Sequence, residues 1–244
     1  MSIIINEQEK LKIFDLSKKF KDLYVAAVSD VLDKMGYINN LVQKEIKPMF
    51  SENSFICGPA TTIRGSGASV KRLAEETNKD ETLQNKPFFI SFLEKVEPGQ
   101  VVVFGSQICD KATVIGDVLS SAFKSKGAEG AIIDGYIRDY DRISPLKWPV
   151  FARGLHQRGG SQLLTYLDID CPLQIGGTLV RSWDIVLGDN DGVVIIPREN
   201  AEDIYKETKK LCEKESIIVN ELINNKDAMQ VNKIMERYLK QIKE

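Results

Sequence analysis

Histidine is almost absent from this sequence, because His156 is the only one among 244 residues. A metal site with two or three imidazole ligands therefore cannot form within one subunit. A Ser-His-Asp or Cys-His catalytic group would have to use His156. This histidine lies in the loop-like segment 154–160, where an exposed loop residue is the simplest interpretation. We expect acid–base chemistry to depend on carboxylates, tyrosine, lysine or water.

Paired cysteines, a strong net charge and long hydrophobic runs are also missing. The cysteines at positions 57, 109, 171 and 212 form no CxxC pair, which argues against a zinc ribbon and favours structural thiols in a reducing cytoplasm. A formal net charge of −2 creates no field for nucleic acid or an anionic membrane. No apolar run approaches the roughly 20 residues that span a bilayer, and residues 1–19 do not resemble a secretory signal. We therefore predict a cytoplasmic protein with neither a nucleic-acid nor a membrane partner.

The composition is that of a globular protein, with 43% hydrophobic and 28% charged residues. Helices are predicted for residues 6–36 with a break near 20–22, for 88–93 and 117–126, and from 199 onward. Strands are predicted for residues 55–64, 101–104, 130–134, 150–152, 173–180, 185–187 and 193–196, and a loop with a short helix for 65–86. No linker rich in Pro, Gly or Ser divides the chain. We expect one α/β domain over residues 1–244, with N-terminal helices and residues 199–244 as a C-terminal helical arm.

The segment Gly116-Asp117-Val118-Leu119 is predicted to begin the helix over residues 117–126. The first turn of a helix leaves backbone N–H groups unpaired, and these donors and the helix dipole favour an anion. Gly116 permits a close approach to the backbone. A substrate carboxylate is therefore expected on the amides of residues 117–119. The alternative is that Asp117 serves only as the N-cap.

A predicted βαβ unit brings a second polar segment to the same place. Strand 101–104, helix 117–126 and strand 130–134 form a crossover between parallel strands. The helix start and the exit of the second strand then share the edge where open α/β sheets bind ligands. Arg138 and Asp139 follow that exit. Arginine suits a carboxylate, and aspartate is an oxygen ligand for Mg²⁺ or Mn²⁺, although a surface ion pair is the alternative.

These residues resemble the signature of a known family. The pattern Gly116-Asp117-x-Leu119, Gly130, Asp134-Gly135-x-x-Arg138-Asp139 is similar to that of the RraA-like family, which includes the regulator of ribonuclease E activity and the class II 4-hydroxy-4-methyl-2-oxoglutarate aldolases. Further segments agree in order between about residues 23 and 215: Gly58-Pro59-Ala60-Thr61-Thr62, Val96-x-Pro98-Gly99-x-Val101-Val102-Val103, Pro149-Val150-Phe151-Ala152-Arg153-Gly154 and Gly188-Asp189-x-Asp191-Gly192-Val193-Val194-x-x-Pro197. The resemblance implies a compact α/β domain of the swivelling β/β/α type, assembled as a homotrimer or homohexamer.

The resemblance also implies roles for the site residues. Asp139 would hold a divalent cation, Mg²⁺ or Mn²⁺, largely together with water, and Arg138 would contact a small oxo-acid substrate. The backbone of residues 116–119 would hold the carboxylate of that substrate. A glutamate from the C-terminal segment of a neighbouring subunit would orient waters at the metal, which places the site near a subunit interface. Glu215 is the best match for this glutamate, and Glu213 is the alternative.

The implied reaction is cleavage of a 4-hydroxy-2-oxo acid to pyruvate and a second carbonyl compound. The metal and Arg138 would stabilise a pyruvate enolate, and a water positioned by Asp117 or Arg138 would take the 4-hydroxyl proton. Oxaloacetate decarboxylation passes through the same enolate, so that side activity is expected. The alternatives are a regulatory protein that binds ribonuclease E or another partner, and a different lyase or sugar-acid enzyme on the same scaffold.

Two segments depart from the family pattern. Where the family often has Pro-Gly-Asp, this chain has Ser182-Trp183-Asp184, and we expect Trp183 to alter a turn or a subunit contact. Where family loops often carry a proline, this chain has His156 and Arg158. These two side chains are candidates for contacts with a different substrate, whose identity the sequence does not reveal.

Overall fold

The computed structural model describes residues 5–52, 54–66, 88–105, 112–160, 165–225 and 227–242. Its helices are α1 (Glu7–Phe20), α2 (Val25–Lys34), α4 (Phe88–Lys95), α5 (Asp117–Ser125), α6 (Tyr140–Ile143), the 3₁₀ helix η1 (Ser144–Leu146), α7 (Ala201–Asn224) and α8 (Ala228–Ile242). Its strands are β1 (Lys47–Pro48), β2 (Ile56–Ser66), β3 (Val101–Gly105), β4 (Thr113–Ile115), β5 (Gly130–Ile137), β6 (Val150–Leu155), β7 (Thr165–Ile169), β8 (Leu173–Ile175), β9 (Thr178–Val180), β10 (Ile185–Asp189) and β11 (Gly192–Ile196). The helix predicted within 65–86 and Cys109 lie outside the described residues.

The described strands form one large mixed sheet and a small hairpin of β8 and β9. Along the large sheet β1, β6, β5, β3, β2, β10 and β11 are neighbours in that order. The strands from β6 to β2 run parallel, and β1, β10 and β11 pair antiparallel. The segment 42–49, which includes β1, joins the two edges, because the Val42 amide donates to Val193 O in β11 and the Met49 amide donates to Val150 O in β6. The sheet is therefore nearly closed, and the predicted α/β single domain is confirmed.

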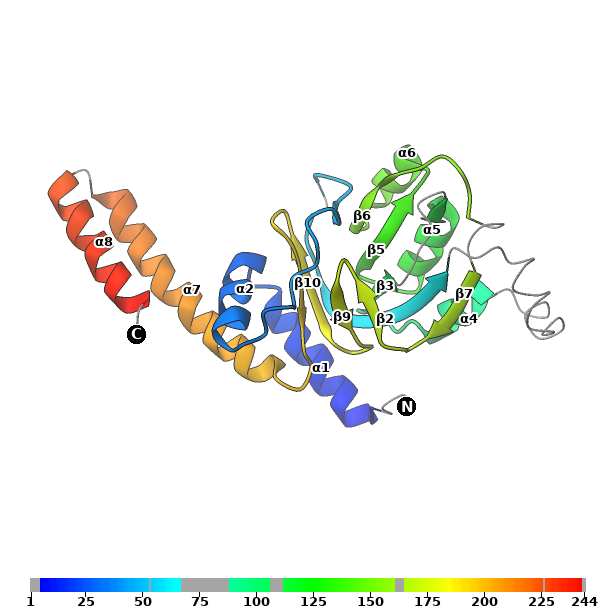
Figure 1. Cartoon of the computed structure of the whole chain (residues 1–244), viewed down its shortest axis with the longest axis horizontal. Coiled ribbons are helices and arrows are strands. Elements are labelled where there is room, and N and C mark those ends of the chain that lie inside the picture. The colour runs from blue at the N-terminus through cyan, green and yellow to red at the C-terminus, as the bar shows by residue number, and fades with distance from the viewer. Residues whose placement is uncertain are drawn as a thin grey trace.

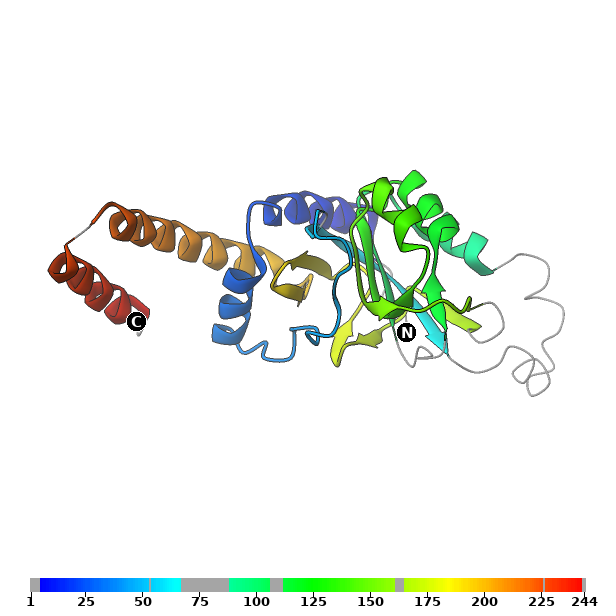
Figure 2. The ribbon, with the colours of Figure 1, turned by 90° about the horizontal axis from the view of Figure 1, so that it is seen from above.

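Buried side chains cover both faces of the central strands. On one outer side α4, α5 and α6 pack against β3, β5 and β6 (Figure 1). On the other outer side α1, α2 and α7 pack against β10 and β11 (Figure 2). Inside the curved sheet the β8–β9 hairpin contributes Leu173, Ile175 and Val180 to the core. Burial on both faces explains why β3 reads as an uninterrupted apolar run rather than an alternating one.

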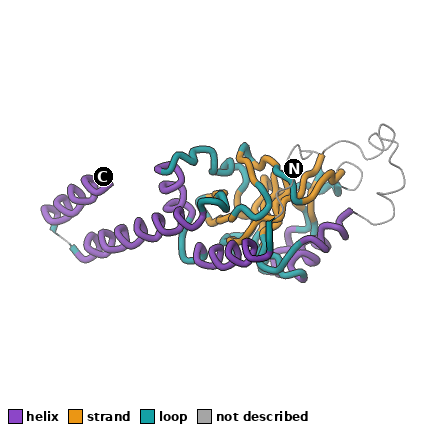
Figure 3. The backbone as a smooth tube through the Cα atoms, turned by 90° about the horizontal axis from the view of Figure 1, so that it is seen from below, coloured by secondary structure: helices purple, strands orange, loops and turns teal. Residues whose placement is uncertain are grey.

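The terminal helices follow the predicted pattern with added detail. Residues 6–36 form α1 and α2, and α1 begins with a capping box in which Asn6 and Glu9 exchange hydrogen bonds of 3.0 and 3.1 Å. The C-terminal arm consists of two helices. α7 packs on α2, α8 packs on α7, and both extend away from the sheet (Figure 3). None of the helices within the described ranges is both long and apolar enough to cross a membrane.

Trp183 shapes a turn and packs against the N-terminal helix of its own chain. Its backbone adopts a φ of 74°, a conformation that glycine adopts at far lower cost. The indole is only 8% exposed and meets the ring of Phe14 edge to face, with ring centroids 5.4 Å apart. The Lys10 ammonium lies 5.1 Å from the indole centroid. Packing against α1 therefore compensates for the backbone conformation.

At position 183 we expect glycine to give a more stable variant than alanine, which is the reverse of the usual order of their stabilities. Removing a buried large aromatic side chain costs about 3–5 kcal/mol, whereas a non-glycine residue at positive φ carries about 1–2 kcal/mol of strain. The packing term is larger, so Trp183→Gly should lower the free energy of unfolding by about 3 kcal/mol. Trp183→Ala should be about 1 kcal/mol less stable than Trp183→Gly, because alanine keeps the strain. Urea denaturation of the three proteins measures both differences, and a more stable alanine variant would contradict the assignment of strain.

Candidate active site

Three parallel strands end at one edge of the sheet. β4 pairs with β5, and β5 pairs with β6, all in parallel register. The residues that directly follow these strands are Gly116, Arg138 and His156. The predicted βαβ unit is confirmed, because β3 and β5 are parallel neighbours connected through α5. β4 is an additional short strand that leads into α5 and that the hydrophobic pattern did not predict.

The backbone donors at the start of α5 are turned toward Asp139. Gly116 is the N-cap of this helix, so the alternative that Asp117 is the N-cap is wrong. The Asp117 amide donates a hydrogen bond of 3.2 Å to Asp139 Oδ2, and the Val118 amide donates one of 2.9 Å to Asp117 Oδ1. Carboxylate oxygens therefore accept from the first two amides of the helix. The donors of the first turn thus bind carboxylates of the chain itself, and the substrate carboxylate expected on these amides stays a prediction.

Arg138 and Asp139 directly follow β5 and lie beside the start of α5. Arg138 Nε lies 3.3 Å from Asp139 Oδ2, and the two side chains are 46% and 27% exposed. Asp139 has a φ of 62°, a left-handed conformation that aspartate and asparagine tolerate better than most residues. The carbonyl of Asp139 accepts hydrogen bonds of 2.9 Å from the amides of Arg142 and Ile143. These bonds hold the strained residue in place, and the bend aims its carboxylate at α5.

Two glycines leave room for these charged groups. A Cβ atom at Gly116 would collide with Asp139 Oδ2 and would also lie 3.2 Å from Arg138 Nε. A Cβ atom at Gly159 would lie 2.9 Å from Arg138 Nη1. Real Cβ atoms do not approach other groups so closely, so a side chain at either position would displace Arg138 or Asp139. The site is therefore a cradle lined by backbone, in which the guanidinium lies between residues 116 and 159.

Arg142 belongs to the site, and sequence reasoning missed it. Its Nε donates to Asp117 Oδ2, so that α6 is joined to the start of α5 by a second charged contact. The hydrogen bond from Arg142 is the main cause that lowers the pKa of Asp117, and the Val118 amide acts in the same direction. Asp117 is therefore an ionised carboxylate at neutral pH. The pair joins residues 25 positions apart, so no local spacing in the sequence indicates it.

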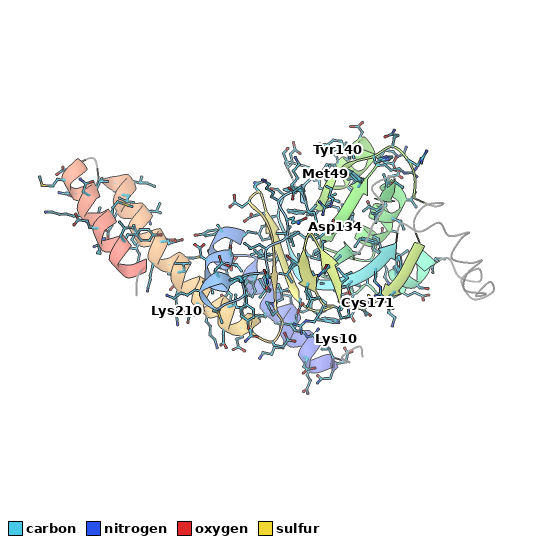
Figure 4. All side chains as sticks on the ribbon, viewed as in Figure 1. Lys10, Met49, Asp134, Tyr140, Cys171 and Lys210 are labelled. Atoms are coloured by element: carbon cyan, nitrogen blue, oxygen red, sulfur yellow. The ribbon has the colours of Figure 1, made fainter. Side chains whose placement is uncertain are left out.

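Asp134 carries part of the sequence signature but has a structural role. It lies within β5, three residues before the end of the strand at Ile137 (Figure 4). Its carboxylate accepts from Arg153 Nε over 2.5 Å and from the Gly176 amide over 2.8 Å. Asp134 therefore ties β5 to β6 and to the β8–β9 hairpin. The same figure shows Tyr140 at the start of α6, where the polypeptide turns after Asp139.

The donor set around Asp139 fits a weakly held hard cation. Among the described residues no group of three or more His, Cys, Asp and Glu side chains is placed to hold a metal. Asp139 Oδ2 has two partners, and Oδ1 accepts no hydrogen bond from any described residue. Mg²⁺ commonly binds through one or two carboxylates and takes its other ligands from water and substrate. One accessible carboxylate beside an anion-binding helix start is compatible with that mode of binding.

Glu215 does not reach this site within one chain. It lies on α7, which extends away from α5 and α6 (Figure 1). Its carboxylate accepts hydrogen bonds from the hydroxyl groups of Tyr24, over 2.7 Å, and Tyr238, over 3.2 Å. Hydrogen bonding to Glu215 is the main cause that raises the pKa of Tyr24. The role predicted for Glu215 concerns a neighbouring subunit and stays a prediction.

A nearly closed mixed sheet with charged groups at its parallel strand ends defines an α/β class, and comparison with known proteins identifies the family. A family model described as RraA-like, Aldolase/RraA, matches residues 25–195. The chain therefore belongs to the RraA-like family. The predicted family is confirmed, and the matched region includes every site residue discussed above except Glu215.

Similar proteins carry two kinds of functional description. A protein of Halalkalibacterium halodurans with the name "Putative 4-hydroxy-4-methyl-2-oxoglutarate aldolase" is 29% identical over 80% of this chain and 83% of its own length. Streptomyces coelicolor RraAS2, described as an unusual member of the RNase ES inhibitor RraA protein family, has a crystal structure with a TM-score of 0.70 and 25% identity, covering 83% of this chain and 96% of that one. An uncharacterized protein from Pseudomonas syringae pv. tomato shares the fold, with a TM-score of 0.74 at 21% identity over 89% of this chain and 96% of its own.

Proposed function

We propose that this chain is a divalent-metal-dependent lyase that cleaves a 4-hydroxy-2-oxo acid to pyruvate and a second carbonyl compound. The observation that carries the proposal is the meeting of the Asp139 carboxylate with the Asp117 amide and the Arg138 guanidinium. A carboxylate for a metal, donors for an anion and a fixed positive charge are the groups that this reaction requires. The aldolase name of the relative from Halalkalibacterium halodurans supports the same class.

The residues have separable roles in the proposed reaction. Asp139 holds Mg²⁺ or Mn²⁺, which acts as a Lewis acid toward the 2-oxo group when it is bound. The amides of residues 117–119 and Gly116 receive the substrate carboxylate, which replaces the Asp139 oxygen now on the Asp117 amide. Arg138 binds the oxo acid and stabilises negative charge on the pyruvate half.

Cleavage of the C3–C4 bond then proceeds through the enolate of pyruvate. The proton of the 4-hydroxyl group passes to a water, C4 becomes a carbonyl, and the C3–C4 electron pair remains on the pyruvate half as its enolate. Protonation at C3 yields pyruvate. Asp117 is suited to orient the water rather than to carry the proton itself, because Arg142 lowers the pKa of its carboxyl group.

A single assay tests the proposed function. The purified protein is mixed with oxaloacetate or with 4-hydroxy-2-oxoglutarate and Mg²⁺ or Mn²⁺, and pyruvate is followed with and without EDTA. We expect metal-dependent pyruvate formation from both, since decarboxylation and aldol cleavage share the enolate. If pyruvate from both compounds stays at the spontaneous rate in either metal, the proposal is wrong.

A regulatory role is the second candidate, and a specific similarity favours it. Streptomyces coelicolor RraAS2, with the same fold, is described as belonging to an RNase inhibitor family. In that role the protein would bind ribonuclease E or a similar enzyme and slow RNA cleavage without turning over an oxo acid. Inhibition of ribonuclease E by a protein that is inactive in the pyruvate assay would favour this candidate.

The proposed enzyme would act as a homotrimer or homohexamer, with Glu215 of one subunit near the site of the next. Within its own chain Glu215 lies on an extended arm, whose exposed apolar side chains include Ile217, Val219 and Ile223. We expect sedimentation equilibrium to give three or six times the chain mass of 27.4 kDa. A monomer at micromolar concentration would exclude completion of the site by a neighbour.

A further inference from the structure

The loop that follows β6, residues 156–160, lies directly against the Arg138 guanidinium. A Cβ atom at Gly159 would come within 2.9 Å of Arg138 Nη1, so the backbone of this loop forms one wall of the cradle. The loop leaves β6 beside the end of β5, because the His156 amide donates a hydrogen bond of 2.9 Å to Ile137 O. His156 is therefore attached to the residue that immediately precedes Arg138.

Further hydrogen bonds give this loop a defined shape. The carbonyl of Arg158 accepts from the Thr113 amide over 2.9 Å and from Thr113 Oγ1 over 3.1 Å, which fixes the loop to β4. The Arg158 amide donates to His156 Nδ1 over 3.0 Å. The loop is thus held to two of the strands that end at the site. A loop restrained in this way can present a side chain to a ligand at a small entropic cost.

The contact at Nδ1 determines what His156 can offer to a ligand. Because Nδ1 accepts a hydrogen bond, the neutral imidazole carries its proton on Nε2, which makes Nε2 a donor. The ring is partly exposed and lies beside Tyr136, with ring centroids 6.0 Å apart. The described residues place no carboxylate within ion-pair distance of His156 or of the exposed Arg158. The loop therefore carries a hydrogen-bond donor and a positive charge that no described carboxylate pairs with.

We infer that the 156–160 loop is the specificity element of the site, and that His156 Nε2 donates a hydrogen bond to a second, distal carboxylate of the ligand. The inference rests on the proposed function, because it takes the 2-oxo acid end of the ligand to lie at Arg138 and Asp139. The ligand would be a 2-oxo dicarboxylate, as is the compound in the name of the Halalkalibacterium halodurans relative, and the inference concerns the residue that binds its second carboxylate. The exposed Arg158 adds positive charge to this loop, which favours the approach of a second carboxylate electrostatically.

Ligand binding tests this inference without any need for turnover. The probes are 2-oxoglutarate and 2-oxopentanoate, two acids of equal chain length of which only the first has a distal carboxylate. Binding is measured by calorimetry with Mg²⁺ on the untagged chain. A charge-assisted hydrogen bond in a shielded site corresponds to about a tenfold to hundredfold difference in affinity. We expect 2-oxoglutarate to bind at least about tenfold more tightly.

Two variants distinguish the role of Nδ1 from the role of Nε2 in the imidazole. In His156→Asn the amide oxygen can replace Nδ1 and keep the bond from the Arg158 amide, but nothing replaces the Nε2 donor. In His156→Gln the amide nitrogen can reach the position of Nε2, but the acceptor is lost. We expect the asparagine variant to lose the preference for 2-oxoglutarate and to bind 2-oxopentanoate as the natural chain does. The glutamine variant should keep part of the preference.

A spectroscopic signal provides an independent measurement, because the chain has a single histidine. In protein labelled with ¹⁵N-histidine, 2-oxoglutarate should shift the Nε2 resonance and 2-oxopentanoate should not. Equal affinities for the two acids, no binding of either acid, or an asparagine variant that keeps the preference would each overturn the inference. If the binding results are as expected but no pyruvate forms in the lyase assay, the proposed reaction fails and the assignment of His156 stands.

Discussion

Asp139→Asn is expected to give a folded protein that has lost metal-dependent pyruvate formation. Asparagine tolerates the left-handed conformation at this position, where φ is 62°, and it can still accept a hydrogen bond from the Asp117 amide. What it lacks is the negative charge that binds a divalent cation. We expect kcat/KM to fall by about 1000-fold, which corresponds to about 4 kcal/mol of transition-state stabilisation.

The comparison with alanine separates function from stability. Asp139→Ala should lose the same activity and should also be less stable by about 1 kcal/mol, because alanine is strained in the left-handed region. Asp141→Asn is the matched control, since it removes an exposed carboxylate from the same short helix and should leave activity unchanged. The measurements are kcat/KM, Mn²⁺ affinity by calorimetry and urea denaturation. A folded Asp139→Asn protein with the natural activity would refute the metal assignment.

The second large loss of activity is expected for Arg138→Lys, and in this variant the metal affinity should be nearly unchanged. Arg138→Lys keeps the positive charge but loses the planar fork that can contact a carboxylate through two parallel hydrogen bonds. Loss of one positioned donor to a developing negative charge typically lowers kcat by about 100-fold to 1000-fold. We expect kcat/KM of Arg138→Lys to fall by about that factor, while the affinity for Mn²⁺ changes by no more than about threefold.

This difference in metal affinity distinguishes the two neighbouring residues. Arg138 touches Asp139 only through Nε, over 3.3 Å, so its replacement should leave the metal ligand in place. Arg181→Lys is the control, because Arg181 pairs with Glu199 in its own chain and neither residue belongs to the site or to the helices of the C-terminal arm. If Arg138→Lys lost Mn²⁺ binding as fully as Asp139→Asn does, Arg138 would have to be assigned to support of Asp139 rather than to the substrate.

The local pattern of the sequence predicts most of the helices and strands around the site. β3, α5 and β5 appear where hydrophobic runs, a glycine-led helix start and a glycine after the helix predict them. These signals are strong because burial on both faces of the sheet demands apolar residues at consecutive positions. The short elements β4 and α6 were not predicted, since three or four residues carry too little periodicity.

The candidate site was predicted only in part, for a related reason. Arg138 and Asp139 were placed near residues 116–119 because parallel strands share an edge, and this placement is confirmed. The pairing of Arg142 with Asp117 depends on the sharp bend at Asp139, and no sequence pattern specifies that bend. Glu215 was identified from a resemblance rather than from its surroundings, and within the chain its partners are tyrosines.

The sequence by itself determined the class of this protein, the order of its elements and the residues that carry charge at the strand ends. Those properties depend on composition and on short-range periodicity, and both can be read directly from the sequence. The tertiary structure decided which atoms of these groups meet. The Asp139 carboxylate reaches the Asp117 amide, and the 156–160 loop forms a wall beside Arg138, because the parallel strands β4, β5 and β6 end at one edge. Contacts of this kind depend on strand order and on a single left-handed residue, and neither is encoded in local sequence.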